Sequence, residues 1–277
     1  MGSHPPPAVD FWADVVDRAE AALAAGVMHS FECDIEYVSD GGVEFALRIA
    51  TRFPKGETAA GRSPDAKPLA RNPFLDPEPQ LIVRDLTPTH RALLNKFSVL
   101  REHLLVATKQ FEPQTALLGE RDFEALAMCM KDAEVLAFYN GGTEAGASQP
   151  HRHMQVVSLP LSPRHSLPMD VLLEARAPLP FRHAAARLAP GDVGDPPRML
   201  DTYRRLHREA GLVEPQPYNL LITHEWMWLV PRSRDRYEGI SINSLAFAGS
   251  FFVRDARHAH AIAAGPPMAV LKSVAMP

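Results

Sequence analysis

The chain has 277 residues, of which 46% are hydrophobic and 22% charged, as expected for a soluble globular protein of one large or two small domains. Its net charge of −4 argues against a nucleic-acid-binding surface, and no apolar run approaches the roughly 20 residues that cross a bilayer. Cys33 and Cys129 lie far apart, and the N-terminus lacks a basic segment followed by an apolar core, so the sequence predicts a cytoplasmic protein with reduced thiols.

Two local patterns organise the N-terminal part of the chain. Residues 9–25 predict an amphipathic helix, because apolar side chains recur at steps of three and four, and Gly26 is suited to end it. The predicted inward stripe consists of Val9, Trp12, Val16, Ala19 and Leu23. Ile35–Val38 and Val43–Thr51 predict two strands, and the Asp-Gly-Gly turn between them predicts a hairpin.

A proline-rich stretch without periodicity, residues 53–79, follows the hairpin and predicts a long loop. Lys55, next to Gly56, is the candidate phosphate contact of this loop, although an ordinary solvated lysine explains it equally well. Leu81–Arg84 then predicts a strand.

A polar pair, Asn95-Lys96, interrupts the apolar sequence before two further predicted strands, at Phe97–Leu100 and His103–Thr108. An asparagine can bind ribose or phosphate oxygens, and a lysine supplies a point charge. A turn capped by polar residues is the competing interpretation of this pair.

Residues 120–138 repeat the helical spacing and predict a second amphipathic helix. Its apolar face would contain Phe123, Leu126, Met130, Ala133 and Ala137. Cys129 and Met130 are interpreted as packing residues. The predicted helix leads to Asn140 and to a glycine-rich loop.

The most informative stretch is Tyr139–Leu161, in which His151, His153 and Gln155 occupy alternate positions before the apolar run that begins at Val156. The run predicts a strand, and side chains two apart on a strand point to the same face. Both imidazoles and the amide would therefore stand in a row.

The loop in front of this row has few bulky side chains. It contains Gly141, Gly142, Gly146, Ala147, Ser148 and Gln149. Glycine permits positive φ angles and lets backbone N–H groups approach an anion closely. The sequence thus predicts a loop able to cradle phosphates beside polar groups able to act on them.

Three interpretations of the row compete. It could be an ordinary edge strand with solvated histidines, or a metal site, since His-x-His on a strand suits zinc or iron. A metal site needs a third His, Cys or carboxylate, and Gln155 is a poor ligand. The third interpretation is nucleophilic catalysis at phosphorus, in which one imidazole attacks and the other groups hold the phosphate or support the charge. Chemistry alone ranks the third interpretation modestly first.

The C-terminal part begins with a proline-rich, irregular connection at residues 162–197. A helix at about 197–210 would turn Met199, Tyr203 and Leu206 inward and stop at Gly211.

Two apolar runs then predict adjacent antiparallel strands, Leu220–Thr223 and Trp226–Val230. His258 and His260 form a second His-x-His pair, but no glycine loop or glutamine accompanies them. We therefore interpret this second pair as solvated surface.

The segment GASQPHRHMQ resembles the His-x-His-x-Gln signature of the diadenosine tetraphosphate (Ap4A) phosphorylases, also called ATP adenylyltransferases, in the histidine-triad superfamily. Galactose-1-phosphate uridylyltransferases carry a related, shorter match, but Ser-Gln-Pro before the first histidine resembles the phosphorylases. NPFLDPEPQL, YNLLIT, WMWLVPRS and GISINSLAFAG resemble further segments of the family, so the resemblance runs from about Lys55 to Gly249.

The mixed order of helices and strands indicates an α+β fold, and the resemblance implies a HIT-like fold with a central antiparallel sheet and helices packed on one side. Residues 1–277 would form a single catalytic domain, whose C-terminal part, about 196–277, completes the nucleotide site. The resemblance implies that His153 is the nucleophile, that Gln155 contacts the phosphate under attack, and that His151 orients the substrate or supports the network. The implied substrate-binding set also contains Lys55, Asn95, Lys96, Asn140, Gly146, Ala147, Ser148, Gln149, Asn219, Thr223 and Arg232.

The resemblance further implies a nucleotidyltransferase that splits Ap4A with inorganic phosphate into ATP and ADP through an adenylyl-histidine. The expected partners are these nucleotides and phosphate, without nucleic acid or membrane, and the protein would be a monomer or homodimer. No cofactor is expected to be required, although Mg²⁺ or Mn²⁺ can accompany the polyphosphate; no protein metal site is expected. Alternatives are a hydrolase using water, another nucleotidylyltransferase, a metal-dependent protein and a non-catalytic dinucleotide sensor.

Overall fold

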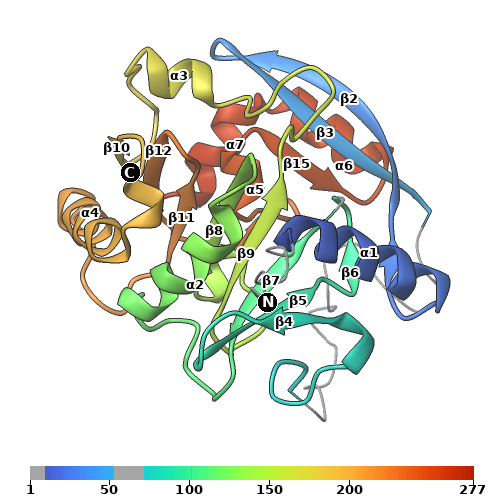
Figure 1. Ribbon diagram of the computed structural model, residues 1–277. Coiled ribbons are helices and arrows are strands. Elements are labelled where there is room, and N and C mark those ends of the chain that lie inside the picture. The colour runs from blue at the N-terminus through green and yellow to red at the C-terminus, as the bar shows by residue number, and fades with distance from the viewer. Residues whose placement is uncertain (1–9, 53–71, 101) are drawn as a thin grey trace, which may run out of the picture.

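The computed structural model describes residues 10–52, 72–100 and 102–277. Its centre is an eight-stranded sheet in the order β10-β12-β11-β8-β9-β7-β5-β4, in which every neighbouring pair is antiparallel (Figure 1). Its strands are β4 (Ile82–Asp85), β5 (His90–Leu94), β7 (Leu104–Thr108), β8 (Val135–Gly141), β9 (His153–Ser158), β10 (Ala184–Arg187), β11 (Tyr218–Ile222) and β12 (Trp226–Pro231). The predicted α+β fold with a central antiparallel sheet is confirmed.

A second sheet of three strands contains the predicted hairpin, β2 (Glu32–Asp40) and β3 (Val43–Arg52), with β15 (Ser250–Val253) parallel to β3. Gly41 and Gly42 form the turn with φ angles of 58° and 85°, which only glycine adopts without strain. The remaining strands form short two-stranded pairs: β1 (His29–Ser30) with β6 (Phe97–Ser98), and β13 (Arg236–Tyr237) with β14 (Ile240–Ser241).

Helices α1 (Phe11–Ala24), α2 (Glu120–Met130) and α4 (Pro196–Glu209) share one hydrophobic core with one face of the central sheet. Alternate residues of β8, such as Ala137 and Tyr139, belong to this core. The intervening residues point to the opposite face, as the pleat of a strand requires.

The opposite face packs against the three-stranded sheet and the C-terminal helices, in a second core that includes Leu136 and Phe138 of β8. The helices on this side are α5 (Ser244–Phe247), α6 (Ala256–Ala264) and α7 (Pro267–Val274), and α3 (Asp170–Glu174) lies in the connection before β10. Helices therefore lie on both faces of the central sheet, not on one face as expected.

The first helix exists as predicted, but its buried stripe is shifted by one residue. Val15, Ala19 and Ala22 are buried, whereas Val16 and Leu23 are 38% and 43% exposed. Alanine-rich helices offer overlapping apolar stripes, and the packing partners select one of them. Gly26 ends the helix with a φ of 67°, as predicted.

The second predicted helix is correct only in its first part. Helix α2 ends at Met130, and residues 135–141 form β8 instead of continuing the helix. Every residue of β8 is buried, and its first five residues, VLAFY, form an apolar run, which periodicity cannot distinguish from a buried helix. Strand β5, between β4 and β7, and helices α3, α5, α6 and α7 were not predicted from the sequence.

The C-terminal helix and strand pair are confirmed, whereas the connection at 162–197, expected to be irregular, contains α3 and β10, and the expected solvated surface position is wrong for His258. Helix α4 buries Met199, Tyr203 and Leu206, and β11 and β12 pair antiparallel. His260 is exposed, whereas His258 is partly buried, with Nδ1 3.2 Å from an oxygen of Asp255. None of the helices in the described ranges is both apolar enough and long enough to cross a bilayer.

Candidate active site

The predicted row of side chains lies on the face of the sheet that carries the second core. On β9, Met154 and Val156 belong to the first core, whereas Val157 belongs to the second, so His153 and Gln155 share the face of Val157. His151 lies just before β9, in an isolated bridge with Pro113. The two imidazoles flank one phenyl ring, with ring centroids 5.4 Å (His151) and 4.9 Å (His153) from that of Phe74.

His153 is held as a neutral imidazole with one nitrogen available. Its Nδ1 lies 2.9 Å from the backbone oxygen of His151, so Nδ1 carries the proton and donates it to that carbonyl. Burial lowers the pKa of His153 to about 4, which keeps the ring uncharged at neutral pH. Within the described part of the chain, no hydrogen bond engages Nε2, whose lone pair is thus free to attack.

His151 is engaged at both nitrogens. Its Nδ1 accepts from Nδ2 of Asn72 at 2.9 Å, so Nε2 carries the proton and donates to the backbone oxygen of Thr108 at 2.8 Å. The hydroxyl of Thr108 also lies 2.9 Å from Nε2. His151 is completely buried, and burial lowers its pKa. The ring of His151 is therefore fixed by the surrounding protein. The backbone carbonyl of the same residue orients the ring of His153.

Gln155 is held by a buried histidine that sequence reasoning missed. Nε2 of His103 lies 2.8 Å from Oε1 of Gln155, and Nδ2 of Asn95 lies 3.2 Å from Nδ1 of His103. Burial lowers the pKa of His103 to about 4. The side-chain oxygen of Asn95 accepts from the N–H of Phe97 at 3.2 Å. The Asn95 amide thus has a protein partner at each end, and its direct contact with the substrate stays a prediction.

Gln114 is a second residue that sequence reasoning missed. Its side chain lies between β8 and β9 where the two strands stop pairing directly. The strand register pairs Phe138 with Gln155, and the next pair of this kind would be Asn140 with His153. The buried Gln114 side chain lies there instead: its Oε1 accepts from His153 N–H at 2.8 Å, and its Nε2 donates to the carbonyls of Asn140 at 2.9 Å and His153 at 3.1 Å. No sequence pattern around residue 114 predicts this role.

Asn140, Asn219 and Arg232 were expected to bind the substrate, but they form a buried hub beneath the glycine-rich loop. Asn219 donates to the side-chain oxygen of Asn140 at 2.8 Å and to the carbonyl of Ala145 at 2.9 Å. Oδ1 of Asn140 also accepts from the N–H and hydroxyl of Ser244 at 3.1 and 2.7 Å.

Arg232 is fully buried, and its guanidinium donates to Asn219 Oδ1 and to backbone carbonyls, including those of Ala145 and Ile242. Burial lowers its pKa to about 9. The three side chains are thus structural anchors of the loop, because satisfied buried groups have little capacity left for a ligand. This corrects the expectation of a basic group at the site's edge.

The glycine-rich loop folds tightly over this hub. Gly146 adopts a φ of 91°, and a Cβ there would lie 2.8 Å from Cβ of Asn243, so the loop reaches its position only with glycine. Ser148 is exposed and Ala147 and Gln149 are partly exposed, directly before the row of histidines. Their contact with phosphate stays a prediction.

Three predicted substrate contacts remain, and they differ in outcome: Thr223 is corrected, Lys96 stays a prediction, and Lys55 cannot be placed. Thr223 is at the end of β11 remote from Asn219, and its hydroxyl accepts from the N–H groups of Glu225 and Trp226 in the turn to β12, which corrects its assignment. Lys96 is partly exposed, with Nζ 2.6 Å from Glu78. Lys55 lies outside the described residues.

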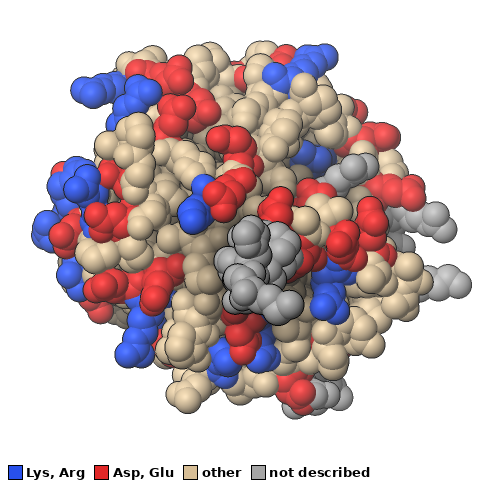
Figure 2. All heavy atoms as spheres, in the orientation of Figure 1, with Lys and Arg blue, Asp and Glu red and all other residues tan. Residues whose placement is uncertain are grey.

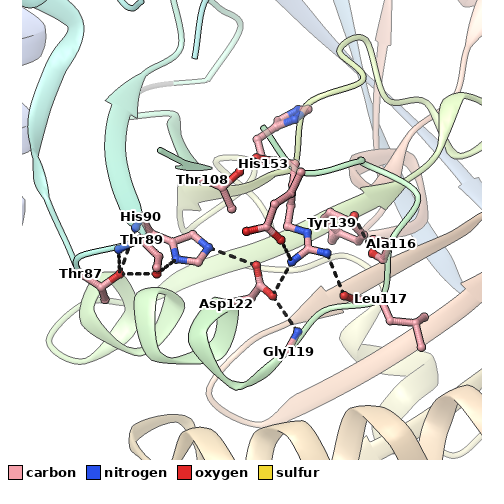
Figure 3. A network of polar contacts seen from close by, with 12 residues as sticks. Thr87, Thr89, His90, Thr108, Ala116, Leu117, Gly119, Asp122, Tyr139 and His153 are labelled. Atoms are coloured by element: carbon pink, nitrogen blue, oxygen red, sulfur yellow. Dashed lines mark hydrogen bonds and ion pairs between the residues drawn. The ribbon is translucent and has the colours of Figure 1, made fainter. Parts of the chain in front are cut away.

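On the opposite face of the sheet, a buried ionic network fixes Arg152, the residue between the two histidines. Asp122 lies between Nε2 of His90, at 3.1 Å, and the guanidinium of Arg152, at 3.2 Å, and it also accepts from Gly119 N–H (Figure 3). A cavity of about 340 Å³ adjoins this network, and its lining includes Arg152 with its two ion-pair partners, Glu112 and Asp122. The network holds the side chain of Arg152 on the face of the sheet opposite His153.

The surface charges and ligand groups bear on what the site can bind. Acidic and basic side chains are interspersed over the face shown in Figure 2, so an anionic substrate must be attracted by local groups. Within the described ranges, no cluster of three or more His, Cys, Asp or Glu side chains is arranged to hold a metal ion. The arrangement offers a neutral imidazole, an oriented amide and a loop of small residues, which together suit nucleophilic attack on a phosphate.

Comparison with known families gives matches along the whole chain. Residues 4–175 match the Ap4A phosphorylase N-terminal domain, and residues 177–277 match the ATP adenylyltransferase C-terminal domain. Diadenosine 5',5'''-P1,P4-tetraphosphate phosphorylase 2 of Saccharomyces cerevisiae is 29% identical over 237 residues, covering 71% of this chain and 72% of the yeast protein. Protein APA1 of the same yeast is 26% identical over 234 residues, covering 73% and 71%.

Solved structures agree on the fold. The structure of yeast Ap4A phosphorylase Apa2 in complex with Ap4A superposes with a TM-score of 0.79 at 23% identity, covering 97% of this chain and 98% of the yeast chain. The complex of the same yeast protein with AMP gives a TM-score of 0.78 at 24% identity, covering 96% of both chains.

Proposed function

The chain belongs to the Ap4A phosphorylase family, and we propose that it splits Ap4A with inorganic phosphate into ATP and ADP. It would act as a nucleotidyltransferase, passing an adenylyl group first to a histidine and then to phosphate. The yeast relative that is named as an Ap4A phosphorylase supports this choice of substrate.

The observation that carries the proposal is the unequal state of the two histidines. His151 has protein partners at both ring nitrogens, whereas within residues 10–52, 72–100 and 102–277 His153 forms a hydrogen bond only through Nδ1, and Nε2 is left for the substrate. Of the two, His153 alone can therefore act as a nucleophile without first losing a structural hydrogen bond.

In the first step, Nε2 of His153 attacks the α-phosphorus at one end of Ap4A. A nitrogen–phosphorus bond forms, the bond from that phosphorus to the bridging oxygen breaks, and ATP leaves with the electron pair. The ring acquires positive charge, which the hydrogen bond from Nδ1 to the carbonyl of His151 stabilises. Burial supports the same step, because it keeps His153 unprotonated and nucleophilic before the attack.

In the second step, an oxygen of inorganic phosphate attacks the adenylyl phosphorus. The nitrogen–phosphorus bond breaks, His153 leaves as a neutral imidazole, and ADP is formed. An imidazole is a suitable leaving group because its pKa lies near neutrality. Splitting one transfer into two displacements at the same phosphorus is the usual advantage of covalent catalysis.

Gln155 would stabilise the charge that spreads over the phosphoryl oxygens in both steps. Its side-chain oxygen accepts from His103, so its NH2 group is the part available to a ligand. A single well-placed donor of this kind is worth about 3 kcal/mol in the transition state. Ser148 and the N–H groups of the loop after Gly146 are expected to add further donors.

We propose no protein-bound metal, but Mg²⁺ or Mn²⁺ would accompany the tetraphosphate of the substrate. A cation bridging the phosphates would lower the charge that the leaving ATP develops. Because the described residues offer no ligand cluster, the cation would be held mainly by the substrate.

The test is to incubate the protein with Ap4A and Mg²⁺, with and without inorganic phosphate, and to resolve the nucleotides. With phosphate, ATP and ADP should appear in equal amounts; ³²P-labelled phosphate should enter ADP as its β-phosphate. A His153→Ala variant serves as the control for contaminating activity. Formation of AMP and ATP at the same rate without phosphate would instead establish a hydrolase.

A further inference from the structure

We infer that His103 and Asn95 are positioning residues that fix the side-chain amide of Gln155 with its NH2 group, and not its oxygen, facing the substrate. The inference rests on the proposed function, which makes Gln155 a donor to the phosphate under attack. It adds to the site two residues that act through Gln155, and their role is to set the direction of a hydrogen-bond chain.

The chain of hydrogen bonds starts at a backbone N–H, whose polarity cannot change. Phe97 N–H donates to the side-chain oxygen of Asn95 at 3.2 Å, which fixes which end of this amide is the oxygen. The NH2 end of Asn95 is therefore the group that lies 3.2 Å from Nδ1 of His103. An NH2 group can only donate, so Nδ1 of His103 must be an unprotonated acceptor.

The state of His103 follows from this contact. A neutral imidazole with an unprotonated Nδ1 carries its proton on Nε2. Two effects favour the neutral ring. Protonation would place an N–H at Nδ1 against the NH2 group of Asn95, and it would create a charge on a side chain that is only 7% exposed. The charged or titratable neighbour that acts on His103 within the described residues is His153, itself neutral through burial.

The polarity of Gln155 is the last consequence. Nε2 of His103 is a donor 2.8 Å from the amide of Gln155, so the group facing it must be the oxygen. The NH2 group is left for a ligand, on the face of the sheet that Gln155 shares with His153, and Gln155 is partly exposed there. If the amide were reversed, an oxygen would face the phosphoryl oxygens and repel the developing charge.

Two substitutions at one position separate this role from simple packing. A glutamine at position 103 can place its NH2 where Nε2 lies and keep donating to Gln155, whereas an asparagine reaches only the position of Nδ1. We expect kcat for Ap4A phosphorolysis to stay within about threefold of wild type in His103→Gln and to fall about 100-fold in His103→Asn, the loss typical of one missing donor. Equal losses in both variants, or no loss in His103→Asn, would overturn the inference.

A third variant, Asn95→Asp, reverses the chain at its source. A carboxylate can only accept from Nδ1 of His103, so the neutral ring would carry its proton on Nδ1. Its Nε2 would then be an acceptor, and the amide of Gln155 would reverse to donate to it. Only the protonated ring, with N–H groups at both nitrogens, would still donate to the oxygen of Gln155. The ratio of kcat in Asn95→Asp to kcat in wild type should therefore rise as pH falls from 8 to 6. A ratio that does not change with pH would contradict this role of Asn95.

Nitrogen NMR of the imidazoles tests the same chain without any turnover. His103 should show the neutral form protonated at Nε2 in wild-type protein at pH 7, and a form protonated at Nδ1 in Asn95→Asp. Wild-type His103 protonated at Nδ1 would overturn the inference even in an active enzyme. Conversely, if wild-type protein fails to form adenylyl-His153 from Ap4A while the NMR result holds, the proposed function is wrong and the hydrogen-bond chain stands.

Discussion

Replacing Gln114 by methionine should both destabilise the protein and slow catalysis, because this side chain substitutes for strand pairing at the nucleophile. Thr108 N–H donates to the carbonyl of Arg152, so the alternation of an antiparallel ladder turns the N–H and C=O of His153 toward β8. There they meet only the amide of Gln114, at 2.8 and 3.1 Å, among the described residues. The carbonyl of Asn140 has a second donor, Gly142 N–H at 3.0 Å, and is less dependent on Gln114.

The magnitude follows from the groups left without a partner. Methionine nearly conserves the volume, so no large cavity forms at this 3% exposed position. Two buried backbone groups of His153 would lose their hydrogen bonds, each at about 1–2 kcal/mol, so the free energy of unfolding should fall by about 2–4 kcal/mol. That loss is smaller than the roughly 5–15 kcal/mol by which typical proteins are stable, so the variant should still fold.

The catalytic effect should exceed what partial unfolding explains. Without the hydrogen bonds to Gln114, the backbone of His153 is no longer fixed in place, and a displacement of its ring on the order of 1 Å typically costs about 100-fold in rate. Denaturant titration and steady-state kinetics on Gln114→Met measure both effects. Gln216→Met is the matched control, since the one hydrogen bond of its amide to the described residues comes from an exposed N–H, that of Val213 at 3.2 Å. A loss of stability under about 1 kcal/mol, or unchanged kcat in a destabilised variant, would refute the reasoning.

Three further predictions concern other parts of the site. His153→Ala should lose several orders of magnitude in kcat, whereas His151→Ala should lose less and still form an acid-labile adenylyl intermediate; label from α-phosphate-labelled Ap4A found on His151 would contradict this. Burial lowers the folded-state pKa of His103 and His153 from 6.5 to about 4, so the unfolded chain binds protons that the folded chain does not. The free energy of unfolding should therefore fall as pH drops from about 6.5 to 4, by roughly 1 kcal/mol per pH unit for each ring, and denaturant titrations of His103→Gln should show a shallower fall; an unchanged slope would refute the assignment. Lys96→Met should weaken Ap4A binding in calorimetry with Tm nearly unchanged, because its ion pair is partly exposed, whereas Lys109→Met, which breaks a similar pair, should leave binding intact.

The sequence by itself determined the features that depend on near neighbours. The alternation of His151, His153 and Gln155 placed these side chains on one face, and two glycines set the turn of the β2–β3 hairpin. The three- and four-residue spacing of α4 indicated its buried face. Each of these signals comes from residues two to four positions apart, which is the range of strand and helix periodicity.

The tertiary structure decided which polar groups serve the substrate and which serve the fold. Arg232 and Asn219 are a basic and a polar residue near a strand end in sequence, yet folding buries them under Ala145, which lies 87 and 74 positions away. His103 meets Gln155 across 52 positions, and Gln114 meets His153 across 39.

No local sequence pattern can predict these long-range partners. Each contact depends on which strands become neighbours in the sheet and on the distance between them. The chemical state of each histidine depends on the same long-range contacts. A carbonyl two residues back sets the proton position of His153, but burial by distant elements lowers its pKa, and Asn72 and Thr108 lock the ring of His151. The motif thus places two histidines side by side, and the surrounding fold makes one of them a nucleophile and the other its support.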